Sequence, residues 1–358
     1  MGAFLKRKNI VFSARRYGID AMGAMAQGLF CSLLIGTIVK TLGQQLNLPF
    51  LVDVGGFAAA MSGPAMAVAI GYALQAPPLV LFSLATVGYA ANKLGSVTLS
   101  GGAGAGGPLA VLLIAIVAAE CGKAVSKETK VDILVTPLVT ILTGVALSAL
   151  IAPAIGTAAS SVGTFVEWAT VLQPFWMGIL VSVVVGVALT LPISSAAICA
   201  ALGLTGLAGG AAVAGCCAQM VGFAVMSFKE NRWGGLVAQG VGTSMLQMPN
   251  IVKNPKIWIP PTLASAITGP LATCLFKLEM NGAAVSSGMG TCGFVGQIGV
   301  YTGWVNDIAS GAKAAITGMD WAGMVLICFV LPALLSWVFC EILRKKGWIK
   351  ENDLKLDL

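Results

Sequence analysis

Long apolar runs alternate with short polar segments along most of this chain. A bilayer core about 30 Å thick is crossed by roughly 20 apolar residues of helix. The pattern predicts spans over residues 19–42, 54–74, 77–92, 106–119, 133–152, 171–191, 196–225, 258–276 and 321–342. With two reentrant or broken segments added, we expect an all-α polytopic membrane protein with about ten transmembrane passes.

One segment, 242–261 (GTSMLQMPNIVKNPKIWIPP), is rich in amide and hydroxyl groups and carries four prolines between apolar runs. Proline interrupts a helix, and each backbone group that it frees costs several kcal/mol if left unpaired in lipid. Such a segment is compatible with membrane depth only where it is buried in protein or lines a wet cavity. It therefore predicts a polar site near the middle of a transporter.

A second segment, 281–303 (NGAAVSSGMGTCGFVGQIGVYTG), has seven glycines and no charged residue. We interpret it as a second reentrant or tightly packed segment opposite the first, with a plain glycine-rich packing helix as the alternative. Gln219 is an amide in the apolar, glycine-rich run 189–226. Its role is either an interhelical hydrogen bond or a contact with substrate, and the sequence does not decide between them.

Together these segments define the candidate substrate-binding residues by their neutral hydroxyl and amide groups, which both donate and accept hydrogen bonds. The candidates are Gln219, Thr243, Ser244, Gln247, Asn250, Asn281, Thr291 and Gln297. Such groups suit a polyhydroxylated solute, and their oxygens equally suit a dehydrated cation.

Composition agrees with a membrane protein, because 57% of the 358 residues are hydrophobic and 10% are charged, against roughly 25% charged in soluble domains. The net charge of +7 comes from basic residues in short connections and at the two ends, so it does not indicate a nucleic-acid partner. These residues gather within 6–16, 123–130, 229–232 and 344–346. The positive-inside rule places all four regions, and thus both termini, in the cytoplasm.

This topology divides the chain into a basic cytoplasmic N-terminus (1–17), a transmembrane domain (18–342) and a cytoplasmic tail (343–358). Within the transmembrane domain, 18–230 includes the scaffold helices and 235–303 carries the broken substrate-site segments.

Three connections are less regular. The glycine-rich stretch 93–107 is compatible with a flexible loop or with backbone packed tightly against the core. Residues 120–132 alternate acids and bases, which predicts a solvated cytoplasmic loop or a docking face for a soluble partner. Residues 151–175 are expected to form an outer loop or a short interfacial helix.

Several residue types with catalytic or metal-binding chemistry are missing. The chain has no histidine, no P-loop motif, and no acidic residue between Glu230 and Glu279. Its nine cysteines include no CxxC and mostly fall in apolar segments, where they are expected to act as small packing residues. We therefore assign no catalytic residue and expect no metal or cofactor.

Four long motifs carry a resemblance to a known family. They are VSKETKVDILVTP, LTLPISSAAICAALGLTGLAGGAAVAGCCAQMVGFAV, GTSMLQMPNIVKNPKIWIPPTLASAITGP and NGAAVSSGMGTCGFVGQIGVY. Over roughly 50–340 the chain resembles the bacterial phosphotransferase-system EIIC-like family (PTS EIIC type 2), which includes the perfringolysin-regulator (PfoR-like) proteins. It is distantly similar to the glucose and lactose EIIC sugar transporters.

This resemblance implies a fold, partners and a location. The sugar EIIC subunits are homodimers of the bacterial inner membrane, with ten helices, two reentrant hairpins and an elevator-type architecture. They bind sugar at mid-membrane and present it to the phosphocysteine of EIIB, so separate cytoplasmic EIIB and EIIA proteins are implied partners.

The family's sugar motif is matched only in part. Its tail, PIVxNPxLxIP, is similar to IVKNPKIWIPP here, whereas its essential glutamate would fall at Thr243 or Ser244 and its histidine has no counterpart. General-base help, typically about 10²- to 10⁴-fold, is therefore not expected from this chain, which argues against a direct part in phosphoryl transfer.

Three functions stay open on the sequence alone. The first is an EIIC-like solute permease for a sugar or polyol, with or without EIIB partners. The second is an ion or small-anion transporter or channel on the same scaffold, and the third is a membrane sensor or regulator.

Overall fold

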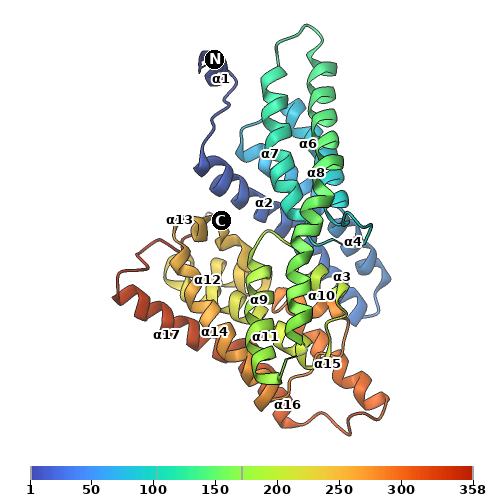
Figure 1. Cartoon of the computed structure of the whole chain (residues 1–358), viewed down its shortest axis with the longest axis vertical. Helices are drawn as coiled ribbons and strands as arrows, with labels where there is room; N and C mark the ends of the chain where they lie inside the picture. The colour runs from blue at the N-terminus through green and yellow to red at the C-terminus, as the bar shows by residue number, and fades with distance from the viewer. Residues whose placement is uncertain (1, 103, 171, 357–358) are drawn as a thin grey trace. The chain divides into compact units, whose positions relative to one another are not determined.

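The computed structural model describes residues 2–102, 104–170 and 172–356 (Figure 1), and this part of the chain is built from helices without a named strand. Its α-helices are α1 (Gly2–Arg7), α2 (Ala21–Leu29), α3 (Ile35–Gln45), α4 (Pro49–Ala60), α5 (Ser62–Ala73), α6 (Pro78–Gly95), α7 (Gly107–Val125), α8 (Asp132–Thr170), α9 (Pro174–Thr190), α10 (Ser195–Ala201), α11 (Gly206–Met226), α12 (Phe228–Val237), α13 (Met248–Lys253), α14 (Ile259–Pro270), α15 (Val295–Ala309), α16 (Gly318–Val325) and α17 (Leu331–Lys345). Short π-helical and 3₁₀ turns join several of them. The predicted all-α class is confirmed.

Helices long and apolar enough to cross a membrane are present in the described part of the chain. Five continuous helical stretches qualify, and a sixth is formed if α4 and α5, bent by 47°, are counted as one broken span. They are Arg16–Gln44, Gly107–Val125, Asp132–Val162, Gly206–Met226 and Gly318–Lys345. A multi-pass membrane protein is confirmed, whereas the expected total of about ten passes stays a prediction.

The chain forms two compact units, residues 1–160 and 161–358, with the division inside α8. In the first unit, α5 packs against α2, α6 and α7, and α6 and α7 run side by side (Figure 1). Glycines permit the closest approach, because a Cβ on Gly63 would lie 2.4 Å from the carbonyl oxygen of Gly88. This close packing explains why small residues recur along these helices.

Helix α8 corrects the expectation for residues 151–175. The predicted span 133–152 does not end there, because α8 continues through Pro153 to Thr170. Proline is tolerated within membrane helices, although its missing N–H leaves the carbonyl four residues earlier without its usual partner. The expectation of an outer loop or a short interfacial helix over 151–175 was therefore wrong for residues 151–170, which continue the same helix.

The sequence left two interpretations of the glycine-rich stretch 93–107, a flexible loop and a tightly packed backbone, and the structure contains both. Gly101 has a φ of +81° and open space around it, typical of a free turn. In contrast, a Cβ on Gly106 would lie 2.7 Å from the Ile155 carbonyl oxygen. The second half of the stretch is thus packed tightly against α8.

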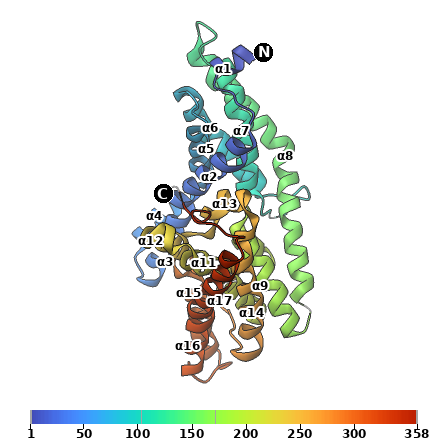
Figure 2. The ribbon, with the colours of Figure 1, turned by 90° about the vertical axis from the view of Figure 1, so that its left-hand side faces the viewer.

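The second unit is organised around α11. This helix is 89% buried in its most apolar window and packs against α9, α14 and α17, as Figures 1 and 2 both show. A Cβ on Gly215 would lie only 1.8 Å from the Ser182 carbonyl oxygen of α9. The glycine is what lets the two backbones touch.

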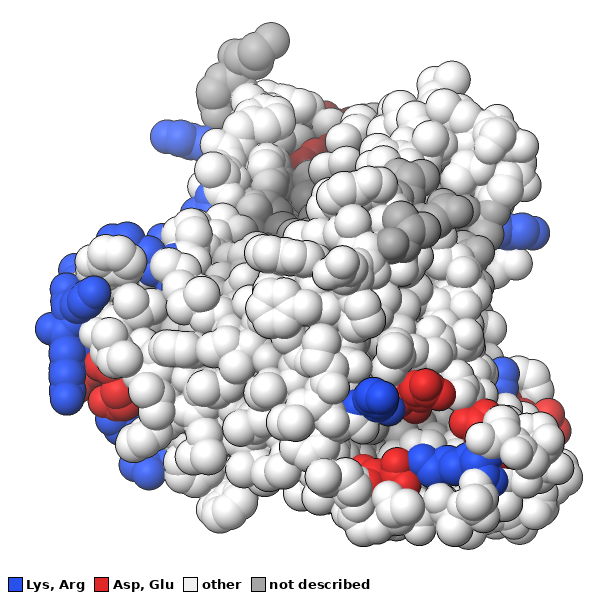
Figure 3. Space-filling model, turned by 60° about the horizontal axis from the view of Figure 1, so that its bottom comes forward, with Lys and Arg blue, Asp and Glu red and all other residues white. Residues whose placement is uncertain are grey.

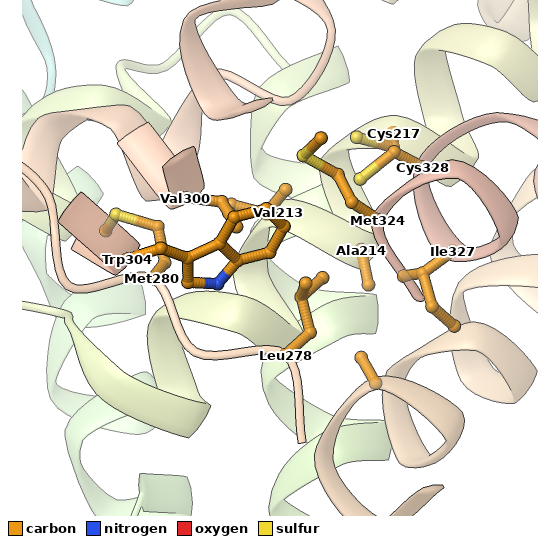
Figure 4. Close-up of a cluster of buried hydrophobic side chains, with 11 residues drawn as sticks. Val213, Ala214, Cys217, Leu278, Met280, Val300, Trp304, Met324, Ile327 and Cys328 are labelled. Carbon is orange, nitrogen blue, oxygen red and sulfur yellow. The ribbon is translucent and has the colours of Figure 1, made fainter. Parts of the chain in front are cut away.

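The connection between α14 and α15 is largely non-helical and packs against the start of α11. Gly206 and Met280 pair through two backbone hydrogen bonds of 3.1 and 3.0 Å. Leu278, Met280 and Trp304 are at most 2% exposed and join residues of α11, α16 and the adjoining π-helical turn in one hydrophobic cluster (Figure 4). This cluster fixes the second glycine-rich segment against the central helix.

Charged side chains are distributed as expected for a membrane protein. On the face drawn in Figure 3, lysine, arginine and acidic residues gather toward the margins, and a broad area between them is uncharged. Large apolar side chains such as Phe57, Tyr72, Phe82 and Leu150 are at least 70% exposed. Such extensive apolar exposure is compatible with lipid contact.

Candidate functional site

The first broken segment is folded by its own prolines and polar side chains. A π-helical turn (η3, Ala238–Gly242) ends at Thr243, whose extended backbone starts a 3₁₀ turn (η4, Ser244–Gln247). The Thr243 hydroxyl caps that turn by accepting from the Met245 amide at 3.2 Å. After α13, Asn254 caps a second 3₁₀ turn in the same way, with its side-chain oxygen 3.2 Å from the Lys256 nitrogen. The segment therefore runs as a series of single turns, as its prolines predict.

Gln219 lies at the centre of a first polar network. Its side chain is fully buried on α11, its Nε2 donates to the Thr262 hydroxyl at 3.2 Å, and its Oε1 accepts from Trp258 Nε1 at 3.0 Å. The Thr190 hydroxyl lies 3.4 Å from the same oxygen and 2.8 Å from the Ser244 hydroxyl. The network thus joins the ends of α9 and α14 to the first broken segment through α11.

A second network joins Gln239, which precedes the first broken segment, to two amides of that segment. Gln239 Nε2 donates to the Ser227 hydroxyl at 2.8 Å, and its Oε1 accepts from Gln247 Nε2 at 2.8 Å. Gln247 Oε1 in turn accepts from Asn250 Nδ2 at 2.9 Å. Gln239 and Gln247 are fully buried and Asn250 is 6% exposed, so this is a chain of neutral dipoles inside an apolar bundle.

Candidates from the second broken segment have different surroundings. Thr291 is buried with its hydroxyl 3.5 Å from the Met220 sulfur, and Gln297 Nε2 lies 3.2 Å from the Cys217 sulfur. Gln297 Oε1 is buried without a hydrogen-bond partner among the described residues. Both side chains therefore pack against α11.

Asn281 lies elsewhere, at the N-terminal end of α11. Its Oδ1 accepts from the Gly206 amide at 3.1 Å, and its Nδ2 donates to Asp307 Oδ2 at 2.9 Å. These bonds tie the non-helical connection to α11 and to α15. These contacts place Asn281 away from the two polar networks.

The two broken segments meet through η3 and a 3₁₀ turn of the second segment (η8, Cys292–Phe294). Among the side chains that the structure describes, the polar candidates of the two segments do not bond to one another. Ser244 belongs to the Gln219 network, Gln247 and Asn250 to the Gln239 network, and Thr291 and Gln297 to sulfur contacts on α11. The structure therefore brings together part of the predicted set and separates the rest.

The arrangement can recognise a solute through neutral hydrogen-bonding groups. Both networks combine amides, which donate and accept, with hydroxyls, and no group of three or more metal-binding side chains occurs in the described part of the chain. A small cavity of about 200 Å³ adjoins the second network and is lined by Asn250, Lys253, Asn254, Asn352, Asp353 and Lys355. The polar groups thus extend from the buried core to a hollow at the surface of this unit.

Five members of the networks were not singled out from the sequence: Thr190, Ser227, Gln239, Trp258 and Thr262. Thr190 and Thr262 look like ordinary members of apolar helices, whose hydroxyls commonly bond to their own backbone. Gln239, eight residues before Gln247, is the one that could have been found from the sequence, because it is an amide within an apolar, glycine-rich run. The pairing itself depends on how α9, α11 and α14 pack.

These features define a multi-pass helical membrane protein with uncharged polar groups buried beside a broken segment, an arrangement typical of transporters. The sequence matches the family described as phosphotransferase system, EIIC, over residues 19–356. The chain belongs to this family, whose membership suggests a membrane component of sugar transport. Comparison with curated proteins and with solved structures gives no match.

Proposed function

We propose that the chain is a membrane permease for a carbohydrate or related polyol. Solute would be recognised by neutral amide and hydroxyl groups around Gln219 and the first broken segment. The chain itself would perform no phosphoryl transfer, because residues 242–255 hold no carboxylate and the sequence holds no histidine. Separate EIIB and EIIA proteins are possible cytoplasmic partners.

The proposal rests on a group of uncharged polar side chains that are fully buried inside an otherwise apolar helical bundle. Thr190, Gln219, Ser244, Gln239 and Gln247 are all 0% exposed. Buried polar groups in a membrane domain are costly unless paired. A set this large, joined to a broken segment, is better explained by solute recognition than by packing alone.

The same burial supports movement as part of transport. Since these side chains are buried and bond to one another, a solute reaches them only when the segment moves relative to α9 and α11. We propose that the region 235–303 makes this movement, in the elevator-like manner that the family resemblance implies. A homodimer in the bacterial inner membrane, with both termini cytoplasmic, is part of the same proposal.

Uptake of labelled sugars and polyols by proteoliposomes tests the proposal. We expect saturable, electrically silent uptake of at least one such solute by the purified protein. Gln219→Leu removes an amide that bonds to Trp258 and Thr262, and loss of a buried hydrogen bond costs about 1–3 kcal/mol. Uptake by this variant should fall roughly ten-fold or more, since 1.4 kcal/mol corresponds to ten-fold.

Thr268→Val is the matched control. Thr268 is as fully buried as Gln219 and lies on α14, but its hydroxyl donates to the Ala264 carbonyl of its own helix at 3.0 Å. Uptake by this variant should match that of the unmodified protein. A current that persists without any solute, together with no carbohydrate uptake, would instead support an ion channel or transporter.

A further inference from the structure

We propose that the C-terminal tail, residues 348–356, is an intramolecular strap that holds the first broken segment closed and thereby inhibits transport. The inference rests on the proposed function for its transport consequence. The docking of the tail does not depend on that function, because it is given by hydrogen bonds between the tail and the side chains of α13 and its neighbouring turns.

The sequence turns the tail back toward the membrane domain. Helix α17 ends at Lys345, and Gly347 has a φ of +71°, the left-handed conformation that glycine adopts at a helix C-terminus. The Trp348 amide then bonds to the Leu343 carbonyl at 3.0 Å. Asn352, with a φ of +68°, makes a second turn, and the Asp353 carboxylate closes it by accepting from the Lys350 amide at 2.8 Å.

The backbone of the tail accepts from side-chain amides of the candidate solute segment. Gln247 Nε2 donates to the Leu354 carbonyl at 3.0 Å, and Asn250 Nδ2 donates to the Lys355 carbonyl at 2.8 Å. These are the same two amides that end the Gln239 network. In Figures 1 and 2 the C-terminal end of the ribbon lies beside α13, as these bonds require.

Two asparagines hold the tail on either side of these bonds. Asn231 Nδ2 donates to the Leu354 carbonyl at 2.7 Å, and its Oδ1 accepts from the Leu356 amide at 2.8 Å. Asn254 Nδ2 donates to the Trp348 carbonyl at 3.0 Å and to Asp353 Oδ2 at 2.8 Å. Four side-chain amides thus form hydrogen bonds with the backbone of one short peptide.

Apolar contacts fix the tail further. The Leu354 side chain is 0% exposed and Ile349 is 2% exposed, so both are inserted into the protein despite their charged neighbours. Before the tail begins, Arg344 of α17 makes a 2.6 Å ion pair with Glu230 of α12, which fixes the helix from which the tail starts. A tail that was merely solvated would not bury Leu354 and Ile349.

The position of the tail explains why it would inhibit transport. Gln247 and Asn250 are candidate solute ligands, and the tail carbonyls occupy hydrogen-bond donors that solute hydroxyls would need. The tail also links the end of α17 to the segment that has to move. Transport would therefore require the tail to leave, in competition between two hydrogen-bonding partners for the same amides.

Truncation after Gly347 tests the strap. The truncated protein is expected to take up solute faster than the full chain, roughly ten-fold if the strap closes about nine molecules in ten. A synthetic peptide of residues 348–358 should bind the truncated protein and slow its uptake, whereas the same peptide carrying Leu354→Asp should do neither. Equal or slower uptake after truncation, or no binding of the peptide, would overturn the proposal.

A pair of substitutions in the full chain covers the case in which truncation prevents folding. Leu354→Asp places a charge in a fully buried position and should raise both uptake and the deuterium exchange of residues 247–254. Glu351→Gln, at an exposed tail position, should change neither quantity. An effect of Glu351→Gln equal to that of Leu354→Asp, or no effect of Leu354→Asp, would contradict the strap.

The two proposals fail in distinguishable ways. If neither the full chain nor the truncated protein moves any solute, the proposed permease function is wrong. Peptide binding to the truncated protein and exchange of residues 247–254 still decide whether the tail is a docked strap.

Discussion

Replacing Gly215 with alanine is expected to force α11 away from α9. The added Cβ would lie 1.8 Å from the Ser182 carbonyl oxygen and 2.5 Å from the Ser182 carbonyl carbon. Ordinary non-bonded contacts are about 3.5 Å, so the two backbones would have to separate by roughly 1.5 Å or more. Both atoms belong to backbone, which cannot rotate away as a flexible side chain does.

The magnitude follows from the packing. Inserting a methyl group into a tightly packed core costs about 1–3 kcal/mol, and a clash with backbone points to the upper end of that range. In domains of 150–250 residues, 1 kcal/mol shifts Tm by about 2–4 °C. A fall of roughly 6–12 °C in Tm is therefore expected for Gly215→Ala, measured as the loss of monodisperse protein on heating in detergent.

Gly234→Ala is the control for this change. Gly234 lies in α12, and a Cβ there would meet no atom within 4 Å. Alanine is favoured over glycine in a helix by up to about 1 kcal/mol, so Tm should stay constant or rise slightly. A Tm for Gly215→Ala within the error of Gly234→Ala would refute the close α9–α11 contact and, with it, the position of Gln219 between α9 and α14.

Two further matched pairs test other contacts by the same thermal measurement. Gly55→Ala should destabilise the first unit by about 1–3 kcal/mol, because its Cβ would lie 2.4 Å from a carbonyl oxygen of α3, whereas Gly56→Ala meets no atom within 4 Å and should be tolerated; equal effects would show that α3 and α4 are not in contact. Arg344→Met should cost about 3–5 kcal/mol by leaving the Glu230 carboxylate, 6% exposed, without its partner. Lys229→Met breaks an ion pair whose lysine is 65% exposed and should cost at most about 1 kcal/mol, so a larger loss here than at Arg344 would contradict the buried pair.

Helix positions could be predicted from the sequence because the bilayer sets the length of each apolar run. The expected span 106–119 falls almost entirely within α7, and 171–191 overlaps α9. The expected span 196–225 is divided in the structure between most of α10 and nearly all of α11. The end of α8 could not be predicted in this way. Pro153 is a helix breaker in water, but it is accommodated in a membrane helix, and the difference depends on the environment rather than on the local sequence.

The candidate site shows a similar division. Four prolines were enough to predict that residues 242–261 are broken, and the structure divides them into short turns. The partners of Gln219 were not predictable, because Thr190 and Trp258 come from elements that only tertiary packing brings to it.

The tail was also beyond prediction from composition. Leu354 is surrounded by charged residues, which favour a solvated segment, yet its side chain is fully buried. Its burial depends on the amides of Asn231 and Gln247, which satisfy the backbone of the tail.

Recognition of solute by the buried amides is tested by an experimental structure of the protein in lipid nanodiscs with a transported sugar or polyol bound. Density for the solute is expected within hydrogen-bonding distance of Gln219 or Gln247, with the tail displaced from Asn250. Solute density remote from both amides, or uncharged apolar side chains filling the space around Gln219, would contradict recognition by these neutral groups.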